Sequence, residues 1–239
     1  MEEQFARTAA LIGEAALDKL RRSRVILFGL GGVGSFTAEM LARSGVGALT
    51  LVDSDAVAPS NLNRQLEALH STVGMPKTEA VKARIADINP ACRVTVINRF
   101  YLPENADTVD LTEYDCIADA IDTVSAKLEL ISRATALGIP IVCCMGTGNK
   151  LDPTLLRVSD IGKTEGCPLC RVMRRELKVR GIKHLQVVWS PEQPVKPAAP
   201  VSDDNPSRHP PASMAFVPAA AGIILAREII MKLIGESND

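Results

Sequence analysis

The chain has 239 residues, of which 46% are hydrophobic and 23% charged, and its formal net charge is −1. This length and apolar content suffice for one large α/β domain, alone or with an appendage. The near-neutral charge excludes a global electrostatic field that would attract nucleic acid or a membrane surface.

The sequence indicates a protein of a reducing compartment. The first residues, Met1-Glu2-Glu3-Gln4, are acidic and lack the apolar segment of a signal peptide. The longest apolar run near the end, residues 214–226, has 13 residues, which is too short to cross a bilayer. Six cysteines without a secretion signal favour free thiols. We therefore expect a cytoplasmic protein with no membrane association.

The first elements form a recognisable unit. A helix with a basic end is predicted over residues 1–23, followed by a short apolar strand at residues 24–28. The strand leads into the glycine-rich stretch Gly29-Leu30-Gly31-Gly32-Val33-Gly34. A helix at residues 36–44 and a strand at residues 48–52 follow, and Asp53 comes directly after them. This order of strand, glycine turn, helix, strand and acid predicts a nucleotide-binding βαβ unit.

Each glycine of this motif has a physical reason. Gly29 permits the tight turn, Gly31 leaves room for a phosphate to reach backbone N–H groups, and Gly34 lets the helix pack closely. The partial positive charge at the helix N-terminus attracts the anion. Asp53 is placed to accept hydrogen bonds from ribose hydroxyls. A glycine-rich turn that binds no ligand is the alternative interpretation.

The alternation of strands and helices continues to residue 145. A loop at residues 54–75 is unusually long for a compact α/β unit, and such loops are commonly functional. The further predicted elements are a helix at 76–88, a strand at 93–98, a strand at 115–122 that runs into a loop, a helix at 124–138 and a strand at 140–145. This pattern predicts a doubly wound, Rossmann-like and mostly parallel sheet.

The alternation fades beyond residue 150. We expect a strand at residues 155–159, a helix at 168–179, a strand at 184–189 and a final helix at 218–234 that packs back on the sheet. Residues 190–213 are rich in proline and lack an apolar period, which indicates a flexible loop. The prediction is a nucleotide-binding core at residues 1–150 and a smaller, irregular C-terminal extension at residues 151–239 on the same domain.

Polar residues gather where parallel strands should end, which is where such folds bind ligands. They are Asn61, Asn63, Arg64, Gln65, Lys77, Asp119 and Asp122, and Arg7 of the first helix is a further candidate. A site that splits ATP between the α- and β-phosphates needs cations on the phosphates and a carboxylate for Mg²⁺, whereas an NAD site needs neither. Arg64 and Lys77 supply the cations and Asp122 the carboxylate. Solvated surface charges, and an Asp122 that caps the next helix, are the alternatives.

A set of motifs carries a family resemblance over roughly residues 5–165. The stretches are Gly-Leu-Gly-Gly-Val-Gly-Ser, Leu-Val-Asp-Ser-Asp-Ala-Val, Ser-Asn-Leu-Asn-Arg-Gln, Val-Gly-Met-Pro-Lys, Ile-Asn-Pro and Asp-Ala-Ile-Asp. Together they resemble the ubiquitin-activating-type adenylating enzymes, to which ThiF, MoeB and HesA belong. The Phe-Ala-Arg-Thr start, Asp152-Pro-Thr and Ser159-Asp-Ile-Gly-Lys-Thr are most similar to the tRNA threonylcarbamoyladenosine dehydratase branch.

The resemblance implies roles for the matching positions. The glycines that would face the phosphates are Gly31, Gly32 and Gly34, and Asp53 would bind the ribose. The residues that would hold the triphosphate are Asn61, Arg64 and Lys77. It also makes Asp55, Asn63 and Asp119 nucleotide-site residues and Asp122 the Mg²⁺ ligand. Arg7 would reach into the partner subunit's site of a homodimer.

The resemblance also implies a reaction. ATP would adenylate the threonyl carboxylate on adenosine 37 of a tRNA, and the modified side chain would then cyclise with loss of AMP. The substrate supplies the nucleophile, so no cysteine of the enzyme is catalytic. The implied partners are tRNA, a second copy of the chain and a candidate protein of the cysteine-desulfurase system.

The chain departs from ThiF and MoeB at its cysteines. Those proteins carry two Cys-x-x-Cys pairs that bind zinc, whereas this chain has one, Cys167-Pro-Leu-Cys170. A structural zinc site takes four ligands, so His184, His209 or a partner chain would have to complete it. We favour two free thiols at a helix start. Because a helix N-terminus lowers the pKa of a thiol, one of them would suit a redox role.

Two other functions stay open at this point. The same chemistry on the C-terminal glycine of a small sulfur-carrier protein is the first, and the single cysteine pair weighs against it. An NAD(P)-binding oxidoreductase or a nucleotide sensor is the second, and the cations and Asp122 weigh against it.

The helix after Cys170 carries a local basic stripe. Arg171, Arg174, Arg175 and Lys178 have the spacing of one helix face. We hypothesise that this stripe contacts tRNA phosphates. A solvated helix face is the alternative interpretation.

Overall fold

The computed structural model describes residues 3–199 and 211–235. Its described residues form one seven-stranded sheet with the strand order β3-β2-β1-β4-β5-β7-β6. The strands are β1 (Arg24–Phe28), β2 (Ala48–Asp53), β3 (Arg93–Asn98), β4 (Cys116–Asp119), β5 (Ile141–Cys144), β6 (Arg157–Asp160) and β7 (Gln186–Trp189). All neighbours run parallel except β6 and β7, which are antiparallel. The predicted doubly wound, mostly parallel sheet is confirmed.

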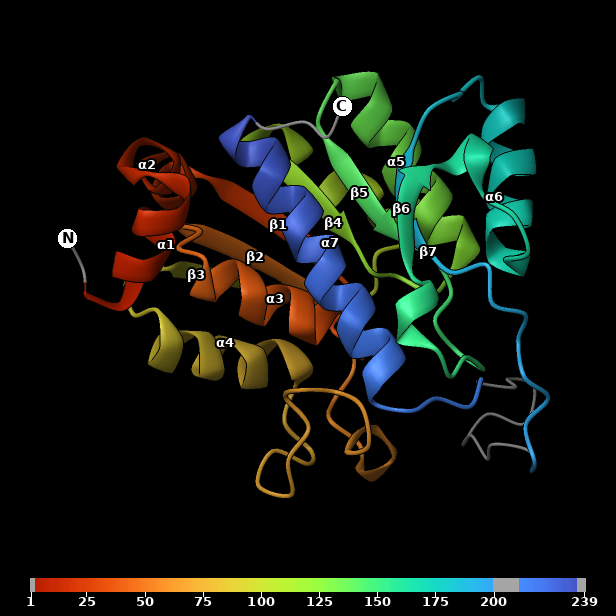
Figure 1. Cartoon of the computed structure of the whole chain (residues 1–239), viewed down its shortest axis with the longest axis horizontal. Helices are drawn as coiled ribbons and strands as arrows, with labels where there is room; N and C mark the ends of the chain where they lie inside the picture. Colours follow the sequence, from red (N-terminus) through yellow and green to blue (C-terminus); the bar gives the residue numbers. More distant parts are fainter. Residues whose placement is uncertain (1–2, 200–210, 236–239) are drawn as a thin grey trace.

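Helices connect these strands and cover both faces of the sheet (Figure 1). They are α1 (Ala6–Ile12), α2 (Glu14–Arg22), α3 (Gly34–Arg43), α4 (Lys77–Ile88), α5 (Val124–Leu137), α6 (Pro168–Val179) and α7 (Phe216–Ile234). Short 3-10 helices stand in the connections: Glu3–Phe5, η2 (Pro59–Asn61), η3 (Pro103–Thr108), η4 (Leu111–Glu113), Pro153–Leu155 and Ile161–Lys163.

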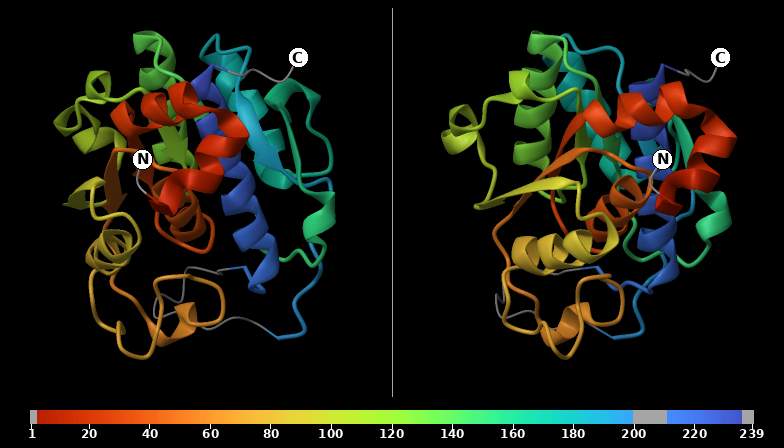
Figure 2. Two further views of the ribbon diagram at one scale, coloured as in Figure 1. Left: turned by 60° about the vertical axis from the view of Figure 1, so that its left-hand side comes forward. Right: turned by 90° about the vertical axis from the view of Figure 1, so that its left-hand side faces the viewer.

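Side chains alternate between the two faces along each buried strand. Val25 and Leu27 of β1 pack in a core with α3 and α7, whereas Ile26 and Phe28 pack in a second core with α5. The two turned views show these helix layers on opposite sides of the sheet (Figure 2). The continuous apolar run of β1 is therefore explained by burial on both faces.

The N-terminal segment differs from its prediction as a single helix over residues 1–23. It forms two helices, α1 and α2, because Gly13 between them has a φ of 84°. Lys19 of α2 donates to the carbonyl of Ile234 at the end of α7 (2.8 Å). The pair of helices therefore lies at the amino edge of the sheet.

The last third of the chain extends the same sheet. The strands predicted at residues 155–159 and 184–189 form as β6 and β7, and α7 packs against α3 beside the centre of the sheet (Figure 1). Residues 200–210 of the loop predicted to be flexible lie outside the described residues. Within the described part of the chain, no helix combines the length and apolar character that a membrane span requires.

The strand order reverses between β1 and β4, which are neighbours in the sheet. From β1 the chain proceeds to β2 and β3 on one side, and from β4 to β5 on the other. The carboxyl ends of β1 and β4 therefore border the crevice in which open α/β sheets bind ligands. The loop between β2 and α4 lies below this edge (Figure 1).

Candidate active site

The glycine turn after β1 is built by close backbone approaches. Gly29 has a φ of 86°, and a Cβ on it would lie 2.7 Å from the carbonyl oxygen of Ala120, just after β4. A Cβ on Gly34 would lie 1.8 Å from the carbonyl oxygen of Gly29. Gly34 is buried and has the packing role that the motif predicts. The expectation that it also faces a phosphate is not supported by this packing.

Gly31 and Gly32 present the backbone that an anion would meet. Among the described residues, none accepts a hydrogen bond from the N–H of either glycine. A Cβ on Gly31 would have only Gln65 Nε2 nearby, at 3.8 Å, whereas Gly32 lies against Pro218. These free N–H groups stand at the N-terminus of α3, where the helix dipole favours negative charge.

Asp53 ties the glycine turn to the following loop. Its carboxylate accepts hydrogen bonds from the N–H of Leu30 (2.6 Å) and the N–H of Asp55 (2.8 Å). The side chain is half-buried at the end of β2. The ribose contact expected of Asp53 stays a prediction. In this structure its carboxylate fixes the conformation of the glycine turn through the hydrogen bond from Leu30.

The loop between β2 and α4 folds on its own side chains. Asn61 is buried, and its Oδ1 accepts from the N–H of Ala58 (3.1 Å). Arg64 donates to Asn63 Oδ1 and to the carbonyl of Ser60, both at 2.9 Å. Burial lowers the pKa of Arg64, and the nearby Glu67 opposes that shift. Asn61 therefore shapes the loop. The backbone of Arg64 passes close to the glycine turn, since a Cβ on Gly32 would lie 3.3 Å from the Arg64 carbonyl oxygen.

Lys77 begins α4 and is held by Asp55. Its Nζ lies 2.9 Å from Asp55 Oδ2, and its backbone N–H donates to the carbonyl of Asp55 (2.9 Å). The Lys77 side chain is 5% exposed and that of Asp55 51%. A phosphate that reaches Lys77 therefore has to compete with Asp55.

Asp119 ends β4 at the carboxyl edge of the sheet, but its side chain is fully buried. Its carboxylate and the Nζ of Lys127 are 2.8 Å apart, and both side chains are fully buried. Lys127 also donates to the carbonyls of Ile121 (3.0 Å) and Cys144 (2.9 Å). Burial alone would lower the pKa of Lys127, but Asp119 outweighs it and raises that pKa. The nucleotide contact expected of Asp119 stays a prediction, and in this structure the Asp119–Lys127 pair fixes the loop after β4 to the end of β5.

Asp122 is the exposed carboxylate of that loop. Its one hydrogen bond to a described residue comes from Thr123 Oγ1 at 3.3 Å. The alternative in which Asp122-Thr123 caps the next helix holds for position only, since Thr123 is the N-cap of α5 but no side chain makes a capping hydrogen bond. Among the described residues, no three His, Cys, Asp or Glu side chains are grouped to hold a metal ion. The site fits Mg²⁺ bound through one carboxylate together with nucleotide phosphates.

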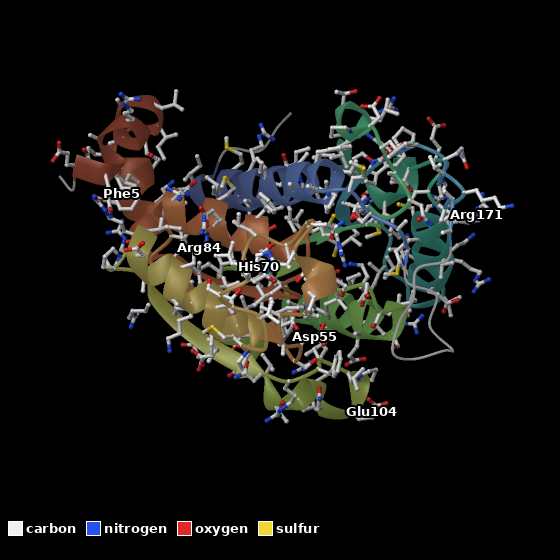
Figure 3. The ribbon with its side chains drawn as sticks, turned by 90° about the horizontal axis from the view of Figure 1, so that it is seen from below. Phe5, Asp55, His70, Arg84, Glu104 and Arg171 are labelled. Atoms are coloured by element: carbon white, nitrogen blue, oxygen red, sulfur yellow. The ribbon has the colours of Figure 1, made fainter. Side chains whose placement is uncertain are left out.

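Arg7 is not brought to this site within one chain. It is exposed on α1, and the nearby Phe5 packs toward Gly45 at the amino edge of the sheet. Viewed from the side of the loop between β2 and α4, Phe5 lies far from Asp55 (Figure 3). A role for Arg7 in catalysis therefore requires a second copy of the chain.

Cys167 and Cys170 are both buried free thiols at the start of α6. The hydrogen bond from Cys170 lowers the pKa of the Cys167 thiol, and Lys150 adds to the effect. His184 pairs with Asp160 (3.2 Å), and His209 lies outside the described residues. No third described ligand joins the two thiols, so zinc here stays a prediction without structural support.

The basic stripe on α6 is narrower than predicted. Arg171, Arg175 and Lys178 are exposed, and Arg171 projects from the far side of the molecule (Figure 3). Arg174 is half-buried, and its guanidinium donates to the carbonyl of Thr164 (2.7 Å). It therefore anchors the helix and is not part of an exposed stripe.

Two buried residues of the loop have side-chain oxygens without hydrogen-bond partners, and one of them, Glu67, is additional to the predicted site. Gln65 is 7% exposed and its Oε1 has no hydrogen-bond partner among the described residues. Glu67 is 2% exposed and both of its carboxylate oxygens lack such a partner. Gln65 stands within the quoted motif, but the sequence carries no signal that distinguishes Glu67 from a surface acid.

The comparison with known families follows this geometry. The family model described as ThiF family matches residues 5–239. The chain belongs to the ThiF family. Among relatives, the tRNA threonylcarbamoyladenosine dehydratase of Bacillus subtilis (strain 168) is 42% identical over 98% of this chain and 96% of its own length.

Solved structures of this ThiF-family fold extend the likeness to the whole chain. The structure of E. coli tRNA N6-threonylcarbamoyladenosine dehydratase, TcdA, in complex with ATP is 36% identical with a TM-score of 0.87. The structure of the same enzyme in complex with AMP is also 36% identical, with a TM-score of 0.88. Each match covers 98% of this chain and 95% of the other. The fold of the ThiF-family chain is therefore shared from α1 to α7.

Proposed function

We propose that the chain is an ATP-dependent adenylating enzyme that acts on the threonylcarbamoyl group of adenosine 37 in tRNA and then drives its cyclising dehydration. The observation that carries the proposal is the glycine turn at the carboxyl edge of the sheet, where the N–H groups of Gly31 and Gly32 have no acceptor among the described residues. Arg64, Lys77 and Asp122 are the residues that we propose to meet the phosphates there. The names of the close relatives support the tRNA substrate.

The geometry suits the first chemical step. Free N–H groups of Gly31 and Gly32 bind a phosphate, and Asp53 receives the ribose hydroxyls. An oxygen of the substrate carboxylate attacks the α-phosphorus, the bond between the α- and β-phosphates breaks, and pyrophosphate leaves. Arg64 and Lys77 stabilise the charge that develops on the leaving pyrophosphate. Mg²⁺ held by Asp122 would supply further charge compensation.

The second step needs no nucleophile from the protein. A nucleophile within the same modified side chain attacks the carboxyl carbon of the acyl-adenylate, and AMP leaves. All six cysteines are buried in this structure, which fits a mechanism without a cysteine thioester. The cyclic product follows from loss of AMP in place of water.

Activation of a sulfur-carrier protein is the second candidate. It requires the same adenylation, and the chain holds the residues for it. The cysteine pair weighs against it, because Cys167 and Cys170 have no third described ligand for zinc. We retain the tRNA substrate as the proposed one.

Assembly and location belong to the same proposal. We infer a homodimer in which Arg7 enters the partner's site, since Arg7 lies at the opposite edge of its own sheet. A protein of the cysteine-desulfurase system is a further proposed partner, and the six free thiols support a cytoplasmic location.

The decisive experiment combines two measurements. ATP–pyrophosphate exchange is measured with tRNA that carries threonylcarbamoyladenosine, with unmodified tRNA and with a sulfur-carrier protein, and the tRNA nucleosides are then analysed by mass spectrometry. Exchange and a cyclic nucleoside only with the modified tRNA support the proposal. Exchange only with the carrier protein supports the second candidate, and no exchange with any substrate refutes both.

A matched pair of variants links this activity to the site. Lys77→Ala removes the buried cation and should lower exchange by about 10²–10³-fold, as loss of comparable charge-stabilising groups does. Lys82→Ala removes a lysine from the same helix and should leave exchange unchanged. Equal activity of the two variants would contradict the assigned role of Lys77.

A further inference from the structure

Glu67 is a buried carboxyl group beside the nucleotide site that the proposed chemistry does not use. It is 2% exposed, and neither oxygen makes a hydrogen bond of ordinary geometry with a described residue. The nearby donors are engaged elsewhere: Ser35 Oγ donates to the carbonyl of Gly31 (2.8 Å), and Lys77 Nζ pairs with Asp55. A buried carboxyl without a fixed partner is costly to keep ionised.

Charged and polar groups face Glu67 from every element packed around it. Ser35 and Glu39 of α3 and Arg84 of α4 line a small cavity with it, and the cavity also contains Leu66, Val81 and Ile85. Glu39 binds Arg84 (2.5 Å) and Arg43 (2.7 Å), so its charge is fully compensated by these two arginines.

The remaining charges near Glu67 are those of the nucleotide site. Lys77 of α4 attracts the Glu67 carboxylate, and Asp53 of β2 repels it. The negative charge of Glu67 in turn opposes the lowering of the Arg64 pKa by burial. Burial raises the pKa of Glu67 to about 7, against the smaller lowering effects of its own backbone N–H, Lys77 and Ser35. Glu67 is therefore partly protonated and partly ionised near neutral pH.

A bound triphosphate would upset this balance. It brings several negative charges close to the cations that compensate Glu67, and those cations turn to the phosphates. We propose that Glu67 is a positioning residue which serves as the counter-charge of Arg64 and Lys77 while the site is empty and takes up a proton when ATP binds. This inference rests on the proposed function, since it requires ATP in the site. Protonation removes a like charge from beneath the phosphates and releases both cations to them.

Calorimetry can count the proton directly. Binding of MgATP is measured at pH 7.5, without tRNA, in two buffers of different ionisation heat. Wild type should take up about half a proton per site more than Glu67→Gln does, because a pKa raised by about one unit changes occupancy by that amount. Protons carried by the nucleotide itself are the same for both proteins and cancel.

The affinity for ATP provides a second measurement. Between pH 6.5 and 8.5 the wild-type Kd should rise roughly threefold to tenfold relative to that of Glu67→Gln, which has no proton to lose. Glu104→Gln is the control, because it removes an exposed carboxyl that does not line this cavity, and it should behave as wild type. Glu67→Leu keeps the volume and tests the same loss if the amide variant does not fold.

The outcomes separate the inference from the proposed function. ATP binding with equal proton uptake by wild type and both Glu67 variants would overturn the inference alone. Wild type that binds ATP with no pH-dependent change in Kd would do the same. Absence of any ATP binding would refute the proposed function itself.

Discussion

Three of the four buried carboxylates among the described residues differ in how their charge is compensated. Asp119 pairs with a lysine as deeply buried as itself, and Glu39 accepts from two half-exposed arginines. Glu67 has no dedicated partner. Because a desolvated charge is stable only when it is paired, the first two carboxylates have structural partners, whereas the third is free to titrate. The pKa of Glu39 shows the difference: burial would raise it, but Arg84 and Arg43 together lower it.

The two glutamates should therefore give opposite dependences of stability on pH. The pKa of Glu67 is raised in the folded state, so the unfolded chain releases this proton first as pH rises, and folding becomes costlier up to about pH 7. Glu67→Gln should be stabilised relative to wild type by up to about 3 kcal/mol at pH 8, and far less at pH 5. Urea unfolding across this range checks the slope.

Glu39 provides the contrasting case. Its pKa is lowered, so its contribution is present above the ordinary glutamate pKa and is lost as pH falls through the folded value. Glu39→Gln should be less stable than wild type at pH 7, and this difference should shrink in acid. A Glu67→Gln difference that does not change with pH would contradict the assigned titration of Glu67.

At the scale of elements, the glycine turn separates packing from binding. Gly34 has the backbone of Gly29 where a methyl group would go, whereas Gly31 has open space. The turn therefore contains one glycine that the fold requires and one that a ligand would require. The helix dipole acts on a phosphate only if the second position stays open.

Alanine at Gly34 and alanine at Gly31 should impair different properties of the protein, the first its stability and the second its affinity for ATP. Gly34→Ala should destabilise the protein by more than about 3 kcal/mol, since its Cβ would overlap a backbone oxygen. Gly31→Ala should unfold at nearly the wild-type urea concentration and yet bind ATP at least tenfold more weakly. Normal ATP affinity in a folded Gly31→Ala variant would place the phosphates elsewhere.

Helix α6 carries a second prediction at this scale. The double variant Arg171→Glu and Arg175→Glu should weaken tRNA binding at least tenfold. It should also reduce the slope of log K against log salt by about 1.4 to 1.8, since each phosphate contact contributes about 0.7 to 0.9. Arg22→Glu with Arg93→Glu changes the net charge equally on exposed residues away from α6 and is the control. If the two pairs had equal effects in filter-binding assays, the loss of tRNA binding would come from net charge alone and not from contacts of α6.

Elements with strong local signals were the ones that could be predicted. β1, α3 and β2 were predictable because apolar runs are bounded by glycines, and α6 because Pro168 opens it. The break at Gly13 was missed, since a glycine inside an amphipathic pattern is compatible with a continuous helix. The antiparallel direction of β6 and the burial of Glu67 depend on contacts distant in sequence. Local pattern placed Arg64, Lys77 and Asp122 at one sheet edge and could not show that Asp119 is sequestered by Lys127.

At the scale of the whole molecule, the N-terminal helices and the proposed active site occupy opposite edges of the sheet. Arg7 stands on α1, and the glycine turn follows the carboxyl end of β1. A rigid seven-stranded sheet separates them, so no small movement within one chain brings Arg7 to the nucleotide. If Arg7 acts in catalysis, the functional unit contains at least two chains.

Subunit mixing tests this arrangement. Arg7→Ala and Lys77→Ala should each be inactive alone, whereas an equal mixture that exchanges subunits should regain roughly a quarter of wild-type activity. Half of the dimers are then mixed, and each has one site with both residues intact. No recovery, in a mixture shown by mass spectrometry to contain mixed dimers, would mean that Arg7 does not act across the interface.

The enclosure of Lys127 has a practical consequence. Amine-acylating reagents cannot reach a lysine with no exposed side-chain surface, so labelling at this position reports only those molecules that have opened globally. The acylation rate of Lys127, measured from peptide masses, therefore reports how often the folded protein opens. It can be followed in a crude cell extract without purification.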